Sequence, residues 1–263
     1  MVSFSSGDLS TLLAMFFWPF VRVLALVATD PIFGSRTIPG QVKIGFSILL
    51  TLAIAPALAP MPAVSPFSAY GLLIVVQQVV IGMAMGLVMR VVFTAIEMAG
   101  HLAGLQMGLG FAMFFDPQHG AQVPVVSQFA SLFGILSFFA MDGHLVVIST
   151  LVESFRLLPV QITPLVADGF KLLFLWGQQI FITGLMLSLP VVAALLITNL
   201  AIGVMTRAAP QFNVFAVGFP LTMSVGFLVL YLTLPYWSGS LGEFFSAGMA
   251  TALRMLRTFS LGS

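Results

Sequence analysis

Cysteine is absent from this 263-residue sequence, and charged residues make up only 6% of it. The missing thiols exclude disulfide bonds, thiolate metal ligands and cysteine nucleophiles. A water-soluble domain carries about 25% charged residues. Since 60% of the residues here are hydrophobic, too few polar side chains exist to cover a globule in water. The composition excludes a soluble enzyme and indicates a membrane protein.

Motifs for common chemistry are missing as well. Neither of the two lysines, Lys43 and Lys171, completes a phosphate-binding loop, and no histidine is followed by the glutamate of a zinc-binding H-E-x-x-H pair. The nucleophile elbow G-x-S-x-G is absent. A net charge of +1 offers no basic surface for nucleic acid. We therefore expect no catalytic site, no cofactor, no metal ion and no nucleic-acid partner.

The apolar residues form long continuous runs, which predict membrane-spanning helices and not the alternating strands of a barrel. The runs lie at residues 9–29, 44–58, 69–89, 91–110, 125–141, 171–205 and 214–234. We expect the third run to stop at Arg90, and Pro190 allows either a kinked helix or a hairpin within 171–205. The last run, broken by Pro220, precedes a separate amphipathic tail. The prediction is an all-α polytopic membrane protein of kinked helical hairpins with about six spans.

Basic residues beside the spans give an orientation. Arg36 and Lys43 place the first connection on the cytoplasmic side, and Arg90 returns the chain there. The amino terminus is then expected outside and the carboxyl terminus in the cytoplasm.

Small residues, nearly all of them glycine, recur four residues apart in three places, a spacing that lets membrane helices approach closely. The candidate packing residues are Gly82, Gly86, Gly100, Gly218 and Gly226, with Thr222 between the last two.

Isolated ionisable residues lie within or beside the apolar runs, where charge is costly and often functional. They are Arg22, Arg90, Glu97, Asp116, Asp142, Glu153 and Arg156. Each could serve a proton relay or line a pore, or could cap a helix or pair locally. Glu153 and Arg156 are three residues apart on one helix face, which favours local pairing.

Ordered motifs along the whole chain carry a family resemblance. Asp30-Pro31-Ile32-Phe33-Gly34-Ser35-Arg36 lies near the start, Gly104 to Ala112 leads into Phe115-Asp116-Pro117, and Asp142-Gly143-His144-Leu145 precedes Arg207-Ala208-Ala209-Pro210-Gln211-Phe212-Asn213. In this order the set resembles the FliR family of flagellar export-gate proteins and their injectisome relatives.

The resemblance implies a non-enzymatic, channel-forming subunit of the flagellar type III export gate, in the bacterial inner membrane at the flagellar basal body. It implies FliP, FliQ and FlhB-like subunits as partners and unfolded flagellar proteins as cargo. It also implies that residues 1–160 form a FliP-like half and residues 161–263 a FliQ-like helical hairpin with a tail.

The same resemblance implies a plug loop over about residues 104–123 that closes the channel. Its expected members are Gly104, Gln106, Met107, Gly108, Gly110, Phe111, Met113, Phe114, Phe115, Asp116 and Pro117. Gly, Met and Phe suit a seal that must re-pack around any polypeptide, and Asp-Pro supplies a rigid turn. From the residues alone, an ordinary connecting loop is the simpler interpretation.

Two other functions stay open. The chain could be an injectisome homologue, or a small proton-coupled transporter that binds a solute at helices broken by Pro190 and Pro220, with Glu97 or Glu153 coupling protons. An intramembrane enzyme using Asp116 or Asp142 is the weakest alternative, because neither has a partner at a recognisable spacing.

Overall fold

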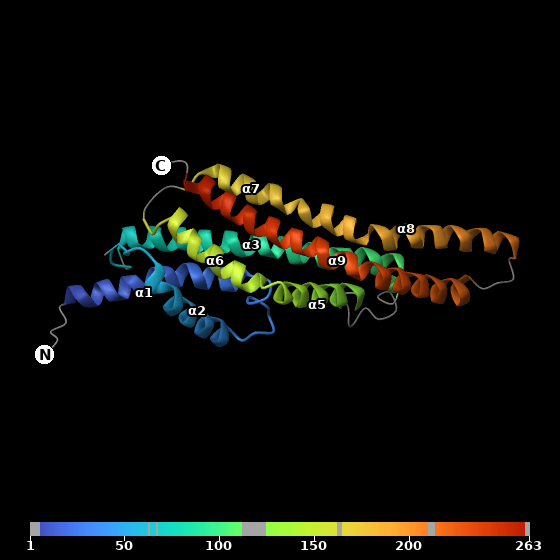
Figure 1. Ribbon diagram of the computed structural model, residues 1–263, viewed down its shortest axis with the longest axis horizontal. Coiled ribbons are helices and arrows are strands. Elements are labelled where there is room, and N and C mark those ends of the chain that lie inside the picture. Colours follow the sequence, from blue (N-terminus) through green and yellow to red (C-terminus); the bar gives the residue numbers. More distant parts are fainter. Residues whose placement is uncertain are drawn as a thin grey trace. The chain divides into compact units, whose positions relative to one another are not determined.

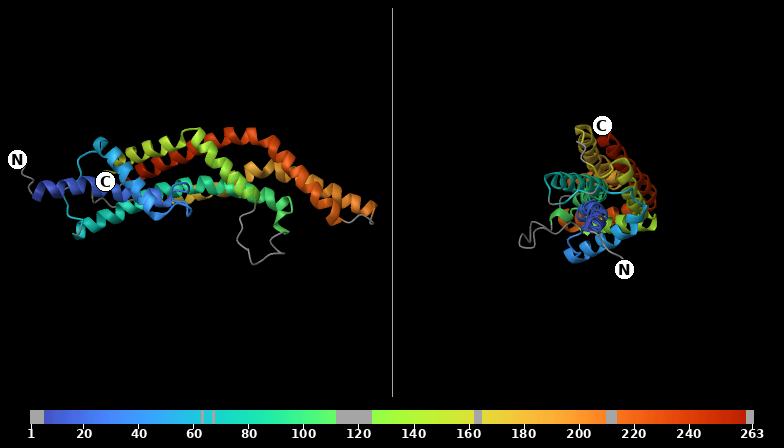
Figure 2. Two further views of the ribbon diagram at one scale, coloured as in Figure 1. Left: turned by 90° about the horizontal axis from the view of Figure 1, so that it is seen from below. Right: turned by 90° about the vertical axis from the view of Figure 1, so that its left-hand side faces the viewer.

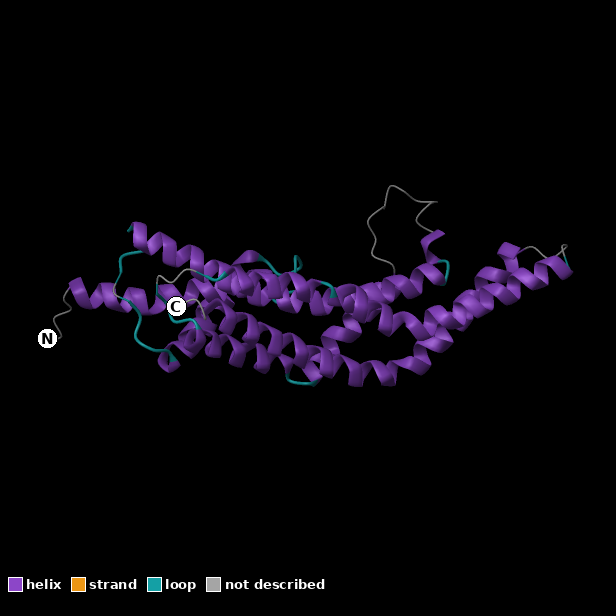
Figure 3. Ribbon diagram, turned by 90° about the horizontal axis from the view of Figure 1, so that it is seen from above, coloured by secondary structure: helices purple, strands orange, loops and turns teal. Residues whose placement is uncertain are grey.

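The computed structural model describes residues 6–62, 64–66, 68–111, 125–161, 165–209 and 214–260. Within these ranges every regular element is a helix and none is a strand (Figure 3). The all-α prediction is therefore confirmed for the part of the chain that the structure describes. Plug residues Met113, Phe114, Phe115, Asp116 and Pro117 lie outside these ranges.

The elements follow one another as a series of helices (Figure 1). They are α1 (Ser6–Thr29), α2 (Gly40–Ile54), η1 (Ala55–Ala57), α3 (Ala69–Gln106), η2 (Leu109–Phe111), α5 (Val125–Ala140), α6 (Gly143–Leu157), α7 (Ala167–Gly177), α8 (Gln179–Ala208) and α9 (Val214–Ser260). Among the described residues, four stretches are long and apolar enough to cross a membrane, or five if α5 and α6 together count as one. The span count of six stays a prediction.

The expected helix end at Arg90 is wrong, because α3 continues without a break to Gln106. Arg90 is exposed, so its charge reaches the surface of the helix without interrupting it. A charged residue ends a membrane run on a hydropathy count, but a helix can continue through it when its side chain lies on the exposed side.

The break predicted at Pro220 and the hairpin alternative at Pro190 are wrong, while the alternative of a helix that continues through Pro190 is confirmed. Pro190 lies inside α8, and the break in the 171–205 run comes earlier, between Gly177 and Gln179. Pro220 and Pro235 both lie inside α9, so the predicted separate tail is the continuation of one 47-residue helix. Membrane helices tolerate proline because neighbouring helices and local adjustments of the backbone satisfy the carbonyl group that loses its hydrogen bond.

The chain divides into two compact units. The first comprises residues 1–91, 142–177 and 245–263, and the second comprises residues 92–141 and 178–244. Both units are built from segments far apart in the sequence, so α3 and α9 contribute to each.

In the first unit, α1 and α3 pack with their backbones in contact. A methyl group at Gly82 would overlap the carbonyl oxygen of Arg22, and one at Gly86 would overlap the Thr29 hydroxyl. The contacts advance in the same direction along both helices, which therefore run parallel (Figure 1). Glycine permits this approach because it has no side chain to hold the helices apart.

In the second unit, α5 packs on α3 through Gly100, where a methyl group would lie 2.6 Å from the Cα of Ser127. The α8 and α9 helices lie side by side (Figures 1 and 2), and the indole Nε1 of Trp237 donates a 3.2 Å hydrogen bond to the Leu187 carbonyl. Aromatic contact adds to the packing, with the rings of Phe133 and Trp237 6.3 Å apart.

We predict that Gly82→Ala destabilises the protein, because the new methyl group meets backbone atoms of α1 and not a flexible side chain. Overpacking of this kind costs about 1–3 kcal/mol. The matched control is Gly45→Ala in α2, where a methyl group meets nothing within 4 Å. Thermal unfolding of both variants in one detergent measures the effect. Equal melting temperatures would contradict the close approach of α1 and α3.

Candidate functional site

The predicted loop leaves α3 through a glycine turn. The Met107 amide donates to the Ala103 carbonyl at 3.0 Å, and the Gly108 amide donates to the Leu105 carbonyl at 3.1 Å. Gly108 has a φ of 85°, in the left-handed region that glycine adopts without strain and that commonly ends a helix. The chain then turns through η2, so the direction in which the loop starts is set by the backbone.

Met107 anchors this first root of the loop. Its side chain is fully buried, and a methyl group at Gly226 of α9 would lie 2.6 Å from both its Cγ and its Cε. The Thr222 hydroxyl, one turn earlier on α9, also lies 3.3 Å from the Met107 carbonyl oxygen, within hydrogen-bond distance. Gly226 therefore provides the space and Thr222 the polar contact that hold the end of α3 against α9.

The second root is held by α3. The Ser127 hydroxyl donates a 2.7 Å hydrogen bond to the Glu97 carbonyl, and Gly100 lies against Val126 and Ser127. Both roots therefore depend on contacts within the second compact unit.

The predicted plug residues that the structure describes differ in how far they are buried. Gly104 and Met107 are buried, while Gln106, Gly108 and Gly110 are half-buried. Phe111 ends η2. The buried Met107 supports the loop from within its own chain.

Arg22 is one of the ionisable residues that the sequence analysis singled out within the apolar runs, and it is fully buried. Its Nε donates to the Gln78 Oε1 at 2.7 Å, Nη1 to the Ser154 hydroxyl at 3.0 Å and Nη2 to the Leu158 carbonyl at 2.8 Å. The guanidinium carbon lies 4.0 Å from the centre of the Phe155 ring. Neutral acceptors and an aromatic face thus surround the charge, in place of a carboxylate.

The Arg22 cluster joins α1, α3 and the end of α6, all in the first unit. Ser154 both accepts from Arg22 and donates to the Leu151 carbonyl at 2.6 Å. Leu158 follows the last turn of α6, where the partial negative charge of the helix terminus favours a cation. The arrangement is suited to holding helices together.

Asp30 follows α1 and is also buried. Burial raises the pKa of its carboxyl, while hydrogen bonds from the amides of Phe33 and Ile32 and the charge of Arg90 act in the opposite direction. Its carboxylate oxygen accepts these amides at 3.0 and 2.9 Å, which fixes the turn after α1.

The remaining candidate charges are dispersed. Arg90 is exposed, Glu97 is half-buried, and Asp142 is exposed just before α6. The Arg156 Nη1 lies 3.4 Å from the Glu153 carboxylate oxygen, and 70% of the Arg156 side chain is exposed, so this is a surface pair. No group of three or more His, Asp and Glu residues that could hold a metal ion occurs in the described ranges.

Sequence reasoning missed the residues that complete these arrangements. Gln78 and Ser154 hold Arg22, and Thr222 contributes a hydrogen bond through its hydroxyl and not only through its small size. Their amide and hydroxyl side chains inside apolar runs were the signal that could have identified them, because a buried polar group needs a hydrogen-bond partner.

The family described as bacterial export proteins, family 1, matches residues 13–248. Flagellar biosynthetic protein FliR of Pectobacterium carotovorum is 47% identical over 235 residues, which cover 89% of this chain and 90% of that protein. FliR of Escherichia coli K12 is 42% identical over the same shares of the two chains. FliR of Bacillus subtilis is 30% identical over 80% of this chain and 82% of its own. The resemblance seen in the motifs is confirmed.

We predict that Arg22→Lys destabilises the protein although it keeps the charge. One ammonium group cannot reach the three acceptors that the planar guanidinium spans, and each lost bond to a charged group is worth about 1.5–3 kcal/mol. The control is Arg156→Lys at the exposed pair, expected to change stability by less than about 0.5 kcal/mol. Thermal unfolding of the two variants compares their melting temperatures. Equal decreases in melting temperature would contradict a stabilising role of the three hydrogen bonds in the Arg22 cluster.

Met107→Ala should lower the free energy of unfolding by about 2–5 kcal/mol, because it leaves a cavity beside Gly226. Met186→Ala is the matched control, since 67% of Met186 is exposed. Denaturant titration in detergent measures both. A Met107→Ala variant as stable as Met186→Ala would show that the root is not anchored at this residue.

Proposed function

Since this chain belongs to the bacterial export proteins, family 1, we propose that it is a membrane subunit of the flagellar type III protein export gate. Relatives named flagellar biosynthetic protein FliR, at up to 47% identity, support a component of the flagellar export apparatus. In this proposal unfolded flagellar proteins pass the bacterial inner membrane through a channel that the chain helps to form. FliP, FliQ and FlhB-like subunits are its partners, and its two halves, divided near residue 160, are FliP-like and FliQ-like.

The observation that carries the gate role is the anchoring of the loop at both roots. Met107 is fixed against α9, and Ser127 is fixed against α3. A loop that closes a channel must return to one place after each passage, and fixed roots supply that constraint. Between them the sequence offers glycine, methionine and phenylalanine, which can re-pack around different polypeptides.

The alternatives gain less support. Of the two residues that could couple protons in a transporter, Glu153 pairs with the exposed Arg156 and Glu97 is only half-buried. Pro190 and Pro220 lie inside long helices and not at unwound segments that would bind a solute. The named relatives are flagellar, which favours the flagellar export gate over the injectisome.

The test replaces Met113, Phe114 and Phe115 by serine while leaving both anchored roots intact. We expect the assembled complex to leak potassium several-fold faster, because a polar loop cannot exclude hydrated ions. The matched control replaces three apolar residues of another connection, Ala59, Met61 and Val64, by serine. Potassium efflux from cells measures the leak, and co-purification of export-apparatus components verifies assembly. Unchanged potassium efflux from cells with an assembled triple variant would refute the proposal that this loop closes the channel.

A further inference from the structure

The α2 helix buries two hydroxyl side chains and exposes several large aliphatic side chains. Ser47 and Thr51 are fully buried, whereas 68% of Leu49, 55% of Leu52 and 36% of Ile48 is exposed. The two hydroxyls donate to carbonyls one turn earlier, at 2.7 Å to Lys43 and 2.6 Å to Ser47. They therefore need no other partner, and a helix that exposes large aliphatic side chains in this way is not suited to face water.

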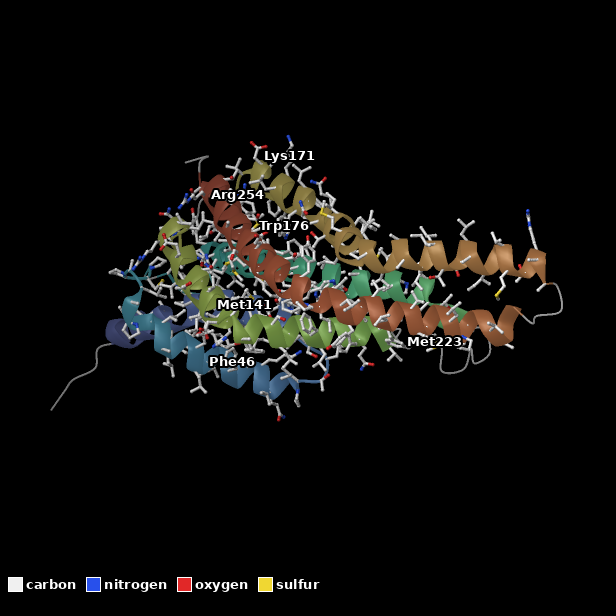
Figure 4. The ribbon with its side chains drawn as sticks, turned by 45° about the vertical axis from the view of Figure 1, so that its right-hand side comes forward. Phe46, Met141, Lys171, Trp176, Met223 and Arg254 are labelled. Atoms are coloured by element: carbon white, nitrogen blue, oxygen red, sulfur yellow. The ribbon has the colours of Figure 1, made fainter. Side chains whose placement is uncertain are left out.

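The inner face of α2 is already packed in the first unit. Phe46 and Leu50 share one small space with Leu26 and Val27 of α1 and Val147 of α6. The Phe46 ring also stacks on Phe33, with centres 5.1 Å apart. Figure 4 labels Phe46 on this helix. The outer face is thus a separate surface without a neighbour among the described residues of this unit.

The outer face differs from the glycine contacts through which α3 approaches α1 and α5 closely. Gly82, Gly86 and Gly100 bring backbones into contact. The exposed side of α2 instead carries bulky aliphatic side chains over its second half, and Gly45 lies two residues from the charged Lys43. Acyl chains need no matching shape and accept such a surface, whereas close helix pairs favour small residues.

Charge and length agree with a bilayer. Arg36 is exposed just before α2, and Lys43 lies in its first turn. Lys43 donates a 2.9 Å hydrogen bond to the Gly34 carbonyl, and neither cation makes an ion pair within the described residues. The apolar stretch Gly40–Ala57 has 18 residues, about 27 Å of helix, near the 30 Å of a hydrocarbon core.

We propose that the outer face of α2, formed by Val42, Ile48, Leu49 and Leu52, binds the lipid bilayer directly in the assembled complex, with anionic headgroups at Arg36 and Lys43. Acyl chains cover the aliphatic side chains, and the basic end holds the helix at the cytoplasmic surface, where anionic lipids attract cations. A helix of another protein subunit on this face is the competing occupant.

The absence of cysteine makes a direct test possible. Single-cysteine variants Leu49→Cys and Leu52→Cys are spin-labelled in the complex with its co-purified export-apparatus components, in nanodiscs. Lipid contact gives high relaxation by oxygen and low relaxation by a water-soluble nickel chelate. Ser47→Cys is the buried control and Thr37→Cys the water-exposed one. Protection from both agents at Leu49 and Leu52 would indicate a protein partner, and nickel access would indicate water; either overturns the proposal.

The headgroup part has its own readout. All three native tryptophans are at most 9% exposed, so a Val42→Trp variant adds a reporter at the basic end of α2. Brominated phosphatidylglycerol should quench it about twofold more than brominated phosphatidylcholine at equal content, and Arg36→Gln should remove the preference. Equal quenching by both lipids in the Val42→Trp protein would overturn the anionic preference. Neither measurement depends on gating, so a failure of the plug proposal leaves them interpretable.

Discussion

The buried guanidinium of Arg22 sets the constraint on which the first unit depends. Taking a charge out of water costs several kcal/mol unless hydrogen bonds replace hydration. Here Gln78, Ser154 and Leu158 supply them, from positions 56, 132 and 136 residues away. These acceptors meet one side chain only if α1, α3 and α6 keep one register. The cluster therefore disfavours sliding of these helices, which nonspecific apolar packing would tolerate.

Glycine makes that register possible. Gly82 lies against the backbone of Arg22 itself, and Gln78 lies one turn earlier on α3, where its side-chain oxygen accepts the guanidinium Nε. Backbone contact at Gly82 thus places Gln78 within reach of Arg22. Trp18, one turn before Arg22 on α1, is also fully buried, so the cluster is enclosed by large side chains.

The sequence predicted the helical class and most helix positions, because long apolar runs are a strong signal. It failed where a local signal was taken as a boundary. Arg90 does not end α3, and Pro220 does not divide α9, since continuity depends on whether neighbours accommodate the residue. The family resemblance located the loop, but the role of Met107 depends on Thr222, which lies 115 residues later in the chain. Contacts between residues so far apart cannot be predicted from the sequence of either segment alone.

Scarcity of polar groups connects these features. Many hydroxyls bond to their own helices, as Thr198 does to Ala194 and Ser224 to Pro220, and offer little to neighbours. Large apolar areas then face outward. In the most apolar stretch of each span, 56% is buried in α3, but only 28% in α7 and α8 and 22% in α9. Helices apolar on all sides are stable only in lipid or against other apolar surfaces. In the proposed gate, α8 and α9 would require such cover, while the few internal polar clusters fix which helices of this chain meet.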